Sequence, residues 1–166
     1  SQEFRLDSSY DGAFNFSAGF YYADIEQEFI TGQNAVNAGL IFPDPITGNS
    51  YDWDKNHYTD TESWSAFAAV YWDITNALTL TAGARYSKDE KDGYIDIAYM
   101  HAFLSGVFGF LPTGSVVGDG ANGTDPLAFD DSEVTPEVSL NWSLSDDVSL
   151  FVAYKTGYKS GGFDNS

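Results

Sequence analysis

Six stretches of this chain alternate apolar and polar residues at every second position. They cover residues 2–6, 14–22, 64–72, 78–86, 134–144 and 148–158. Because the side chains of a β-strand point alternately to its two faces, this period of two predicts six strands, each with one apolar face. Alternation alone fits two structures: the apolar faces form the core of a soluble sandwich, or they meet lipid around a membrane barrel.

The connections between the predicted strands alternate between short and long. Residues 7–13, 73–77 and 145–147 are short, whereas residues 23–63 and 87–133 are each about 40 residues or longer. Outer-membrane barrels place short turns at one end and long loops at the other, which a sandwich has no reason to do. This alternation favours an all-β, antiparallel up-and-down meander of about six strands in the wall of a transmembrane β-barrel, with two long extracellular loops.

Aromatic residues on the predicted apolar faces fall into two levels. Trp64 and Trp72 are eight positions apart on one strand, which is roughly 19 Å along the membrane normal at ~3.3 Å per residue and ~45° tilt. Outer-membrane barrels carry an apolar band about 25 Å tall between two aromatic girdles. We expect the girdles of this chain to contain Tyr22, Trp64, Trp72, Tyr86, Trp142, Tyr154 and Tyr158.

The opposite, polar faces carry four of the seven basic residues of the chain. A barrel lumen accounts for them, and so would the solvated face of a sandwich. If the face lines a lumen, these side chains either take part in binding or only hydrate the wall. The predicted lumen-facing residues are Arg5, Arg85, Lys155 and Lys159.

Charge and composition exclude several function classes. The net charge of −18 argues against a nucleic-acid partner, because phosphate binding relies on a basic surface. Of the 25 acidic residues, 17 lie in residues 23–63 and 87–133, where they either bind divalent ions that bridge lipopolysaccharide or keep the surface solvated. The chain has no cysteine, no Ser/His/Asp arrangement and no phosphate loop. We predict neither an enzyme nor a cofactor.

The segment "YDWDKNHYTD" gathers the best candidates for ligand contact. Trp53, His57 and Tyr58 offer stacking and hydrogen bonds, so they either bind a ligand at the barrel mouth or belong to a solvated loop. His57 and Asp54 form too weak a constellation to predict a metal site.

Two other stretches are interpreted as ordinary loops rather than as a membrane-spanning helix or a metal site. The apolar stretch Ala98–Val117 is interrupted by glycine and proline, which predicts a loop with a short helix rather than a membrane-spanning helix. Its His101 is expected to be a packed or exposed histidine. The segment "DGANGTD", Asp119–Asp125, has the composition of a calcium loop but lacks the spacing and closing glutamate of an EF-hand, so we expect a turn-rich loop.

Several stretches together resemble the barrel of TonB-dependent outer-membrane receptors, especially the iron-complex receptor type. They are "QEFRL", "FNFSAGFYYAD", "WSAFAAVYWDITNALTLTAGARYSKDEKD" and "SEVTPEVSLNWSLSDDVSLFVAYKTGYKSGGF". The order of "LTLTAGARYSKDEKD", "SEVTPEVSLNW" and "GYKSGGF" is more specific than any one of them. The resemblance covers nearly all six predicted strands and misses the two long loops.

The resemblance implies a barrel of about 22 strands closed around an N-terminal plug, in the outer membrane of a Gram-negative-type bacterium. It implies energy-coupled uptake of a scarce ligand such as a ferric siderophore, with the lipid bilayer, lipopolysaccharide, the plug and the TonB complex as partners. In such a receptor, the four basic residues would hydrogen-bond the plug or line the ligand path. Because plug and TonB box have no counterpart in residues 1–166, we expect this chain to be an internal piece of a receptor.

Two other functions stay open at this point. A soluble extracellular β-sandwich would bind a surface through its aromatic residues, and it would bury Leu80, Leu140 and Leu150. A sheet with two unpaired edge strands could instead assemble into an oligomer or fibre.

Overall fold

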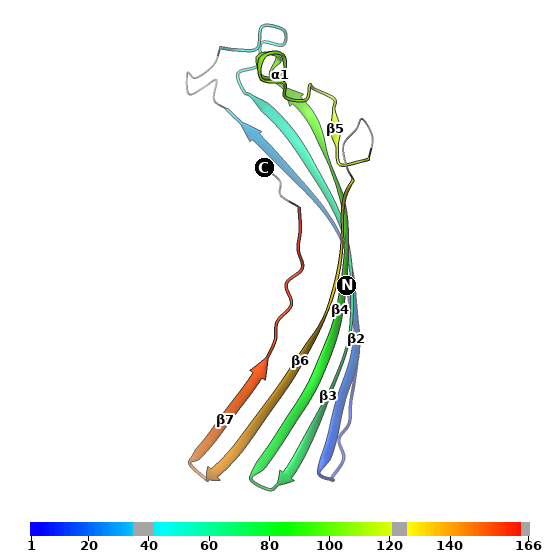
Figure 1. The fold of residues 1–166 in the computed structure, drawn as a ribbon, viewed down its shortest axis with the longest axis vertical. Helices are drawn as coiled ribbons and strands as arrows, with labels where there is room; N and C mark the ends of the chain where they lie inside the picture. Colours follow the sequence, from blue (N-terminus) through cyan, green and yellow to red (C-terminus); the bar gives the residue numbers. More distant parts are fainter. Residues whose placement is uncertain (35–41, 121–125, 164–166) are drawn as a thin grey trace. The chain divides into compact units, whose positions relative to one another are not determined.

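The computed structural model describes residues 1–34, 42–120 and 126–163, and within them a sheet of seven antiparallel strands dominates. Along the sheet the order is β1-β2-β3-β4-β6-β7, so each of these strands lies beside its neighbour in the sequence (Figure 1). The predicted all-β meander is therefore confirmed. The strands are β1 (Gln2–Asp7), β2 (Phe14–Gln33), β3 (Trp53–Thr75), β4 (Leu78–Met100), β5 (Val116–Val117), β6 (Leu127–Ser145) and β7 (Val148–Lys155).

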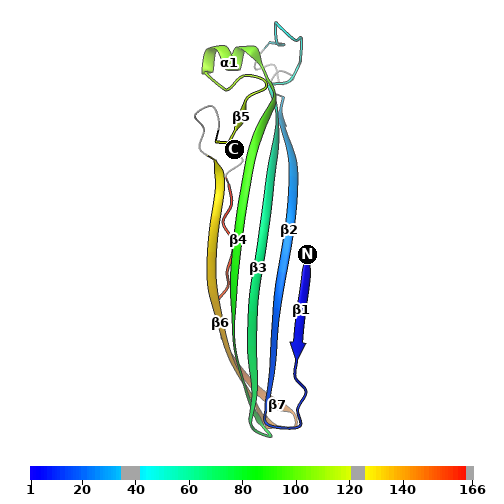
Figure 2. The ribbon, with the colours of Figure 1, turned by 90° about the vertical axis from the view of Figure 1, so that its right-hand side faces the viewer.

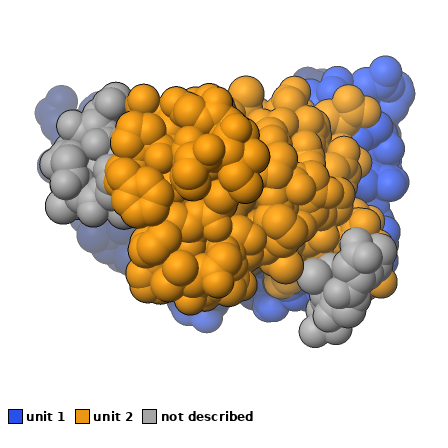
Figure 3. Space-filling view, turned by 90° about the horizontal axis from the view of Figure 1, so that it is seen from above, with its two compact units in different colours: residues 1–24, 62–90, 130–161 blue, residues 25–61, 91–129, 162–166 orange. Residues whose placement is uncertain are grey.

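The chain divides into two compact units, which Figure 3 shows in different colours. Unit 1 comprises residues 1–24, 62–90 and 130–161, and unit 2 comprises residues 25–61, 91–129 and 162–166. Unit 1 contains the strand ends that are joined by the short turns. Unit 2 contains α1 (Ala102–Phe108) and the small strand β5, which pairs with β4.

The strand register of unit 1 sorts its side chains onto two faces. At one edge of the sheet (Figure 2), Phe4 pairs with Phe20 while the next residue, Arg5, pairs with Gly19. Since directly opposed residues of an antiparallel pair share a face, the register keeps apolar residues together and charged residues together. Strands β6 and β7 repeat this pattern, with Trp142 opposite Leu150 on one face and Glu137 opposite Lys155 on the other.

The apolar face of unit 1 is exposed rather than buried. Ala23 is the one buried hydrophobic residue that the structure describes in this unit. Leu80 and Leu140 are partly exposed, and half of the surface of Leu150 is accessible. The soluble sandwich, which required all three leucines in a core, is therefore wrong. The exposed members of this face, called the apolar face below, are Phe4, Leu6, Phe14, Phe16, Phe20, Tyr22, Val70, Trp72, Ile74, Val138, Trp142, Leu144, Val148, Leu150, Val152 and Tyr154.

Four strands extend well beyond the ranges that the alternation predicted, among them β6, which begins at Leu127 instead of residue 134. β2 continues to Gln33, β3 begins at Trp53 and β4 continues to Met100, so much of the two expected long loops is strand. In the added part of β2, acidic residues occupy every second position from Asp24 to Glu28. Because charged residues here occupy the face that is apolar in the predicted part of the strand, the alternation that predicted the strand stops at Tyr22.

Strand β7 ends at Lys155, earlier than the predicted residue 158, and Pro136 supplies the reason. The carbonyl of Pro136 accepts a hydrogen bond from the amide of Thr156, at 3.2 Å. A residue in such a pair normally returns a hydrogen bond from its own N–H, which proline lacks. Regular pairing with β6 therefore stops at Lys155.

In unit 2, α1 is the short helix that was expected within residues 98–117. The side chain of His101 caps its first turn by accepting a hydrogen bond from the amide of Phe103, and Gly109 ends it at φ 72°. Among the described residues, no helix is both long enough and apolar enough to cross a membrane.

Candidate functional site

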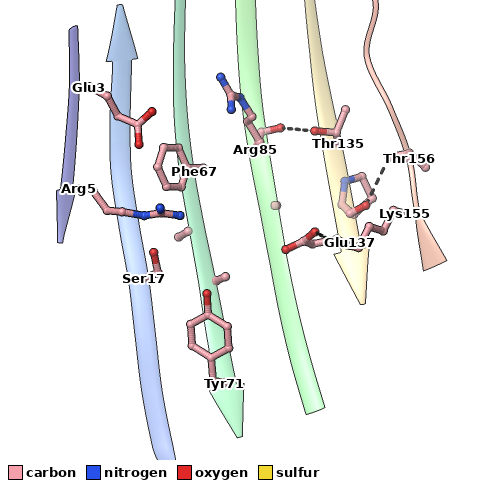
Figure 4. A pocket seen from close by; sticks show the side chains of 14 residues that line it. Glu3, Arg5, Ser17, Phe67, Tyr71, Arg85, Thr135, Glu137, Lys155 and Thr156 are labelled. Carbon is pink, nitrogen blue, oxygen red and sulfur yellow. Dashed lines mark hydrogen bonds and ion pairs between the residues drawn. The ribbon is translucent and has the colours of Figure 1, made fainter. Parts of the chain in front are cut away.

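The charged face of unit 1 contains a pocket of about 430 Å³ (Figure 4). Side chains reach it from strands β1, β2, β3, β4 and β6 and from the end of β7. Most of its polar lining consists of charged groups and hydroxyls rather than amides. The labelled lining residues are Glu3, Arg5, Ser17, Phe67, Tyr71, Arg85, Thr135, Glu137, Lys155 and Thr156.

Three of the four predicted lumen residues line this pocket. Arg5, Arg85 and Lys155 come from β1, β4 and β7, so three separate strands bring their charges to one face. Lys159 follows β7, is exposed and is not among the lining residues. The alternation thus identified residues that share a face, although Lys159 lies beyond the last regular pair.

Ion pairs in the pocket neutralise its basic residues unequally. Lys155 Nζ lies 2.9 Å from a carboxylate oxygen of Glu137, its partner in the strand register. Arg5 Nε lies 3.7 Å from Asp7, and both side chains are more than half exposed, so this pair is weak. Within the described part of the chain, Arg85 has no carboxylate oxygen within the 4.0 Å of an ion pair.

The predicted girdle residues all lie in unit 1. Tyr22, Trp72, Trp142 and Tyr154 are exposed, whereas Trp64, Tyr86 and Tyr158 are partly exposed.

Two groups of stacked rings link neighbouring strands. Phe14 stacks on Trp72 with the ring centroids 5.3 Å apart. Trp64 contacts both Phe20 and Tyr86, with centroid distances of 6.1 and 5.2 Å. Aromatic side chains therefore form two contact groups on β3, at Trp64 and at Trp72.

The three predicted ligand-contact residues of unit 2 do not gather in one place. His57 and Tyr58 are consecutive residues of β3, so they point to opposite faces of the strand. Trp53 lines a small pocket with Tyr51 and Asp54, and Tyr58 lines another pocket with Tyr94. His57 lines neither of them.

His57 and Tyr58 differ in their surroundings as well. His57 is buried, its Nε2 lies 2.8 Å from the hydroxyl of Thr31, and burial lowers the pKa of its ring. Tyr58 stacks on Tyr94 at 4.7 Å between centroids, and a hydrogen bond with the carboxylate of Glu28 raises the pKa of its phenol. Only Tyr58 of these two presents a side chain that is partly open to a ligand.

Asp44 is the centre of a buried network in unit 2 that the sequence did not suggest. Its carboxylate accepts hydrogen bonds from the hydroxyl of Tyr99 at 2.7 Å and from the amides of Ile46 at 2.8 Å, Thr47 at 3.4 Å and Ala102 at 3.3 Å. Burial alone would raise the pKa of Asp44, but these four hydrogen bonds together lower it below its usual range. The network therefore fastens the turn after Asp44 to α1 and the end of β4.

His101 and the calcium-like segment are the remaining features that the sequence singled out. His101 is fully buried and hydrogen-bonds the carbonyl of Phe42 through Nε2 at 2.9 Å, as expected of a packed histidine. Residues 121–125 of the calcium-like segment lie outside the described residues. Among those that are described, no three His, Asp or Glu side chains gather closely enough to hold a metal ion.

Comparisons with known proteins agree with this geometry. A sequence family described as "TonB dependent receptor-like, beta-barrel" matches residues 1–166. The fold is similar to the crystal structure of the ferric yersiniabactin uptake receptor FyuA from Yersinia pestis, with a TM-score of 0.59 and 15% identity over 90% of this chain. The matched part is 19% of the FyuA chain. Among curated protein sequences, none matches this chain.

Proposed function

Because this chain belongs to the TonB-dependent receptor-like β-barrel family, we propose that its sheet is a wall segment of a receptor that takes up a scarce ligand across the outer membrane. Members of this family are receptors and transporters of the Gram-negative outer membrane rather than enzymes. The proposed ligand is an iron chelate such as a ferric siderophore, and the proposed mechanism is uptake coupled to energy from the TonB complex.

The two-faced sheet of unit 1 is the observation that carries the proposal. One face exposes apolar and aromatic side chains, with 66% of Tyr154 and 60% of Val152 accessible, while the other gathers arginine, lysine and glutamate around a pocket. A soluble domain would bury its apolar face. A barrel wall instead needs an apolar face toward lipid and a polar face toward the lumen.

On this basis each face has a proposed partner. The apolar face, with its girdle of tryptophan and tyrosine residues, contacts the lipid bilayer and the lipid part of lipopolysaccharide. The charged face, with Arg5, Arg85 and Lys155, lines the lumen and faces the plug domain of the complete receptor. Lys159 lies beyond the last strand pair, toward the exterior end of the wall.

The strand extensions in unit 2 are the proposed entry region for the ligand. Acidic residues make this region hydrophilic, and partly open aromatic side chains such as Tyr58 and Tyr94 offer stacking surfaces. Support for an iron chelate comes from the fold similarity to FyuA, a ferric yersiniabactin uptake receptor.

The test is uptake by cells that depend on this receptor. A host strain that lacks its own iron-chelate receptors is given the receptor that contains this segment, and accumulation of radioactive iron is measured for a panel of ferric siderophores and haem. We expect at least one complex to accumulate, and accumulation to stop when a protonophore removes the proton gradient or when TonB is deleted. Receptor in the outer-membrane fraction with no accumulation of any complex would refute iron uptake, whereas accumulation that persists without TonB would refute energy coupling.

A further inference from the structure

Both arginines of the sequence meet at one aromatic ring. The guanidinium carbons of Arg5 and Arg85 lie 5.6 and 5.8 Å from the centroid of Phe67, which Figure 4 shows between them. Arg5 belongs to β1 and Arg85 to β4, and β2 and β3 separate these strands in the sheet. Direct strand pairing therefore does not bring the two arginines together, and the ring of Phe67 does.

Gly19 leaves the space that this arrangement needs. A Cβ atom at position 19 would lie 2.3 Å from Cζ of Phe67 and 2.6 Å from the carbonyl oxygen of Phe4. Gly19 is the register partner of Arg5, so the ring of Phe67 lies across β2 at the level of that arginine. Arg5, Phe67 and Arg85 together are called the arginine platform below.

The arginine platform leaves its hydrogen-bond donors available. A guanidinium that lies against an aromatic ring keeps the N–H groups of its edge free for a planar anion such as a carboxylate. Arg5 has only the weak contact with Asp7, and Arg85 has no ion pair with any described residue. In a chain of net charge −18, these two cations lack the close counter-charge that Lys155 has in Glu137.

A buried hydroxyl in the same pocket also lacks a partner. Ser17 lines the pocket, is 2% exposed, and its Oγ has no hydrogen-bond partner in the described part of the chain. Figure 4 draws this hydroxyl and the guanidinium of Arg5 in the same pocket. Because buried polar groups in folded proteins are almost always hydrogen-bonded, Ser17 points independently to a missing acceptor at this place.

We propose that the arginine platform and Ser17 form a binding site for carboxylate groups. The two guanidiniums provide charged donors from two strands, and the serine hydroxyl provides a third donor in the same pocket. Because each guanidinium can bind one carboxylate through its own N–H groups, the platform offers donors for two carboxylates. They belong either to a free di- or tricarboxylate or to acidic side chains of a polypeptide segment that lies against the charged face. The inference rests on the proposed function in one respect, that this face lines the lumen.

The test measures how fast the two arginines react with phenylglyoxal in the receptor that contains this segment, purified in detergent. Mass spectrometry of the peptides around Arg5 and Arg85 gives the rate in buffer, with tricarballylate added, and with sodium chloride added to the same ionic strength. A fourth sample has its own carboxyl groups converted to neutral amides before the reaction. Arginines on peptides outside this segment serve as the internal reference.

Two results support the proposal and identify the source of the carboxylate. If the site accepts a free ligand, tricarballylate slows the labelling about tenfold and chloride does not. If an acidic segment of the receptor already occupies it, labelling is slow in buffer and speeds up about tenfold after amidation. Labelling at one rate in all four samples, or slowed equally by chloride and tricarballylate, would overturn the proposal.

Matched variants distinguish a carboxylate-binding site from a general slowing of the labelling of the two arginines. Phe67→Leu removes the ring that orients the guanidiniums, and Ser17→Ala removes only the third donor, so both are expected to reduce the carboxylate-dependent change in rate. Lys159→Gln removes a charge outside the pocket and is expected to leave it unchanged. The labelling needs no transport, so a receptor that takes up no iron can still show the site, and the proposed function and this inference can fail separately.

Discussion

Replacing Ala68 by arginine tests the orientation of the sheet at its most sensitive position. Ala68 is exposed and lies midway between Trp64 and Trp72 on β3, four residues from each. At ~3.3 Å per residue and ~45° tilt, it is about 9 Å from either aromatic level along the membrane normal. We therefore expect Ala68 to lie at the middle of the apolar band.

The cost of this substitution follows from its depth. An arginine on the lipid face of an outer-membrane barrel costs about 2–4 kcal/mol at the midplane. Because about 1.4 kcal/mol corresponds to a tenfold change in an equilibrium constant, Ala68→Arg should lower the folding equilibrium about 30-fold to 1,000-fold. Folding of the receptor into lipid vesicles, followed by urea titration and by the shift of folded barrel on electrophoresis without heating, measures this loss.

Two control variants isolate the effect of lipid. Ala68→Leu adds apolar volume at the same position and should fold as well as the parent. Ser139→Arg places the same charge on the opposite face, where Ser139 pairs with Ala153, and should cost less than about 1 kcal/mol in water-filled surroundings. Equal losses for Ala68→Arg and Ser139→Arg, or no loss for Ala68→Arg, would refute the assignment of the faces.

Four further outcomes follow from particular contacts. Gly19→Ala forces the ring of Phe67 and the carbonyl of Phe4 to move, and should lower barrel stability by about 1–3 kcal/mol in urea titration, while Gly12→Ala, with open space around it, should be nearly neutral. Asp44→Asn should raise amide hydrogen exchange at Ile46, Thr47 and Ala102 about tenfold or more, because it removes the charge that these amides donate to; unchanged exchange would show that the network does not hold the turn. The pKa of Asp44 is lower in the folded protein than in the unfolded chain, where it is about 4. The ionised carboxylate therefore stabilises the turn fully above about pH 4, and this stabilisation should fade as the pH falls toward the folded pKa. Amide exchange at decreasing pH would detect the loss. Glu137→Gln should change stability by less than about 1 kcal/mol because its ion pair with Lys155 is largely exposed, and a loss of several kcal/mol would contradict that assignment.

The sequence predicted the faces of the sheet well because the pleat of a strand enforces a period of two. Arg5 and Lys155 were assigned to a polar face from alternation alone, and the register places them there together with Gly19 and Glu137 as partners. A one-residue slip would exchange the two faces, so an apolar stripe fixes the register strongly. This local rule needs no knowledge of the rest of the fold.

The extensions of the strands could not be predicted in the same way. Beyond Tyr22 and Tyr86, charged residues occupy positions that would have been apolar, and the backbone pairing there is independent of an apolar face. Because residues 23–63 were expected to form a loop, Trp53, His57 and Tyr58 were grouped as one set of ligand-contact candidates. Once Trp53–Thr75 is a strand, His57 and Tyr58 must point in opposite directions, so they cannot form one ligand site.

The buried network of unit 2 and the arginine platform depend on contacts between distant parts of the chain. Asp44 and Tyr99 are 55 residues apart, and Arg5 and Arg85 meet only through Phe67. A turn at Asp44 was readable from the sequence "DPITG", since aspartate followed by proline and glycine favours turns. Its partners at Tyr99 and Ala102 were not, because no local pattern encodes which strand end a turn will contact.

The most direct test of the account is the environment of consecutive side chains on β7. Since these 166 residues contain no cysteine, single cysteines at positions 148–154 of the receptor can each carry a nitroxide label in lipid vesicles, provided that cysteines elsewhere in the receptor are removed. We predict that labels at Val148, Leu150 and Val152 collide mainly with oxygen dissolved in lipid, and labels at Ser149, Phe151 and Ala153 mainly with a water-soluble nickel complex. The same accessibility at all positions, or the reverse alternation, would contradict a wall segment with its apolar face in the membrane.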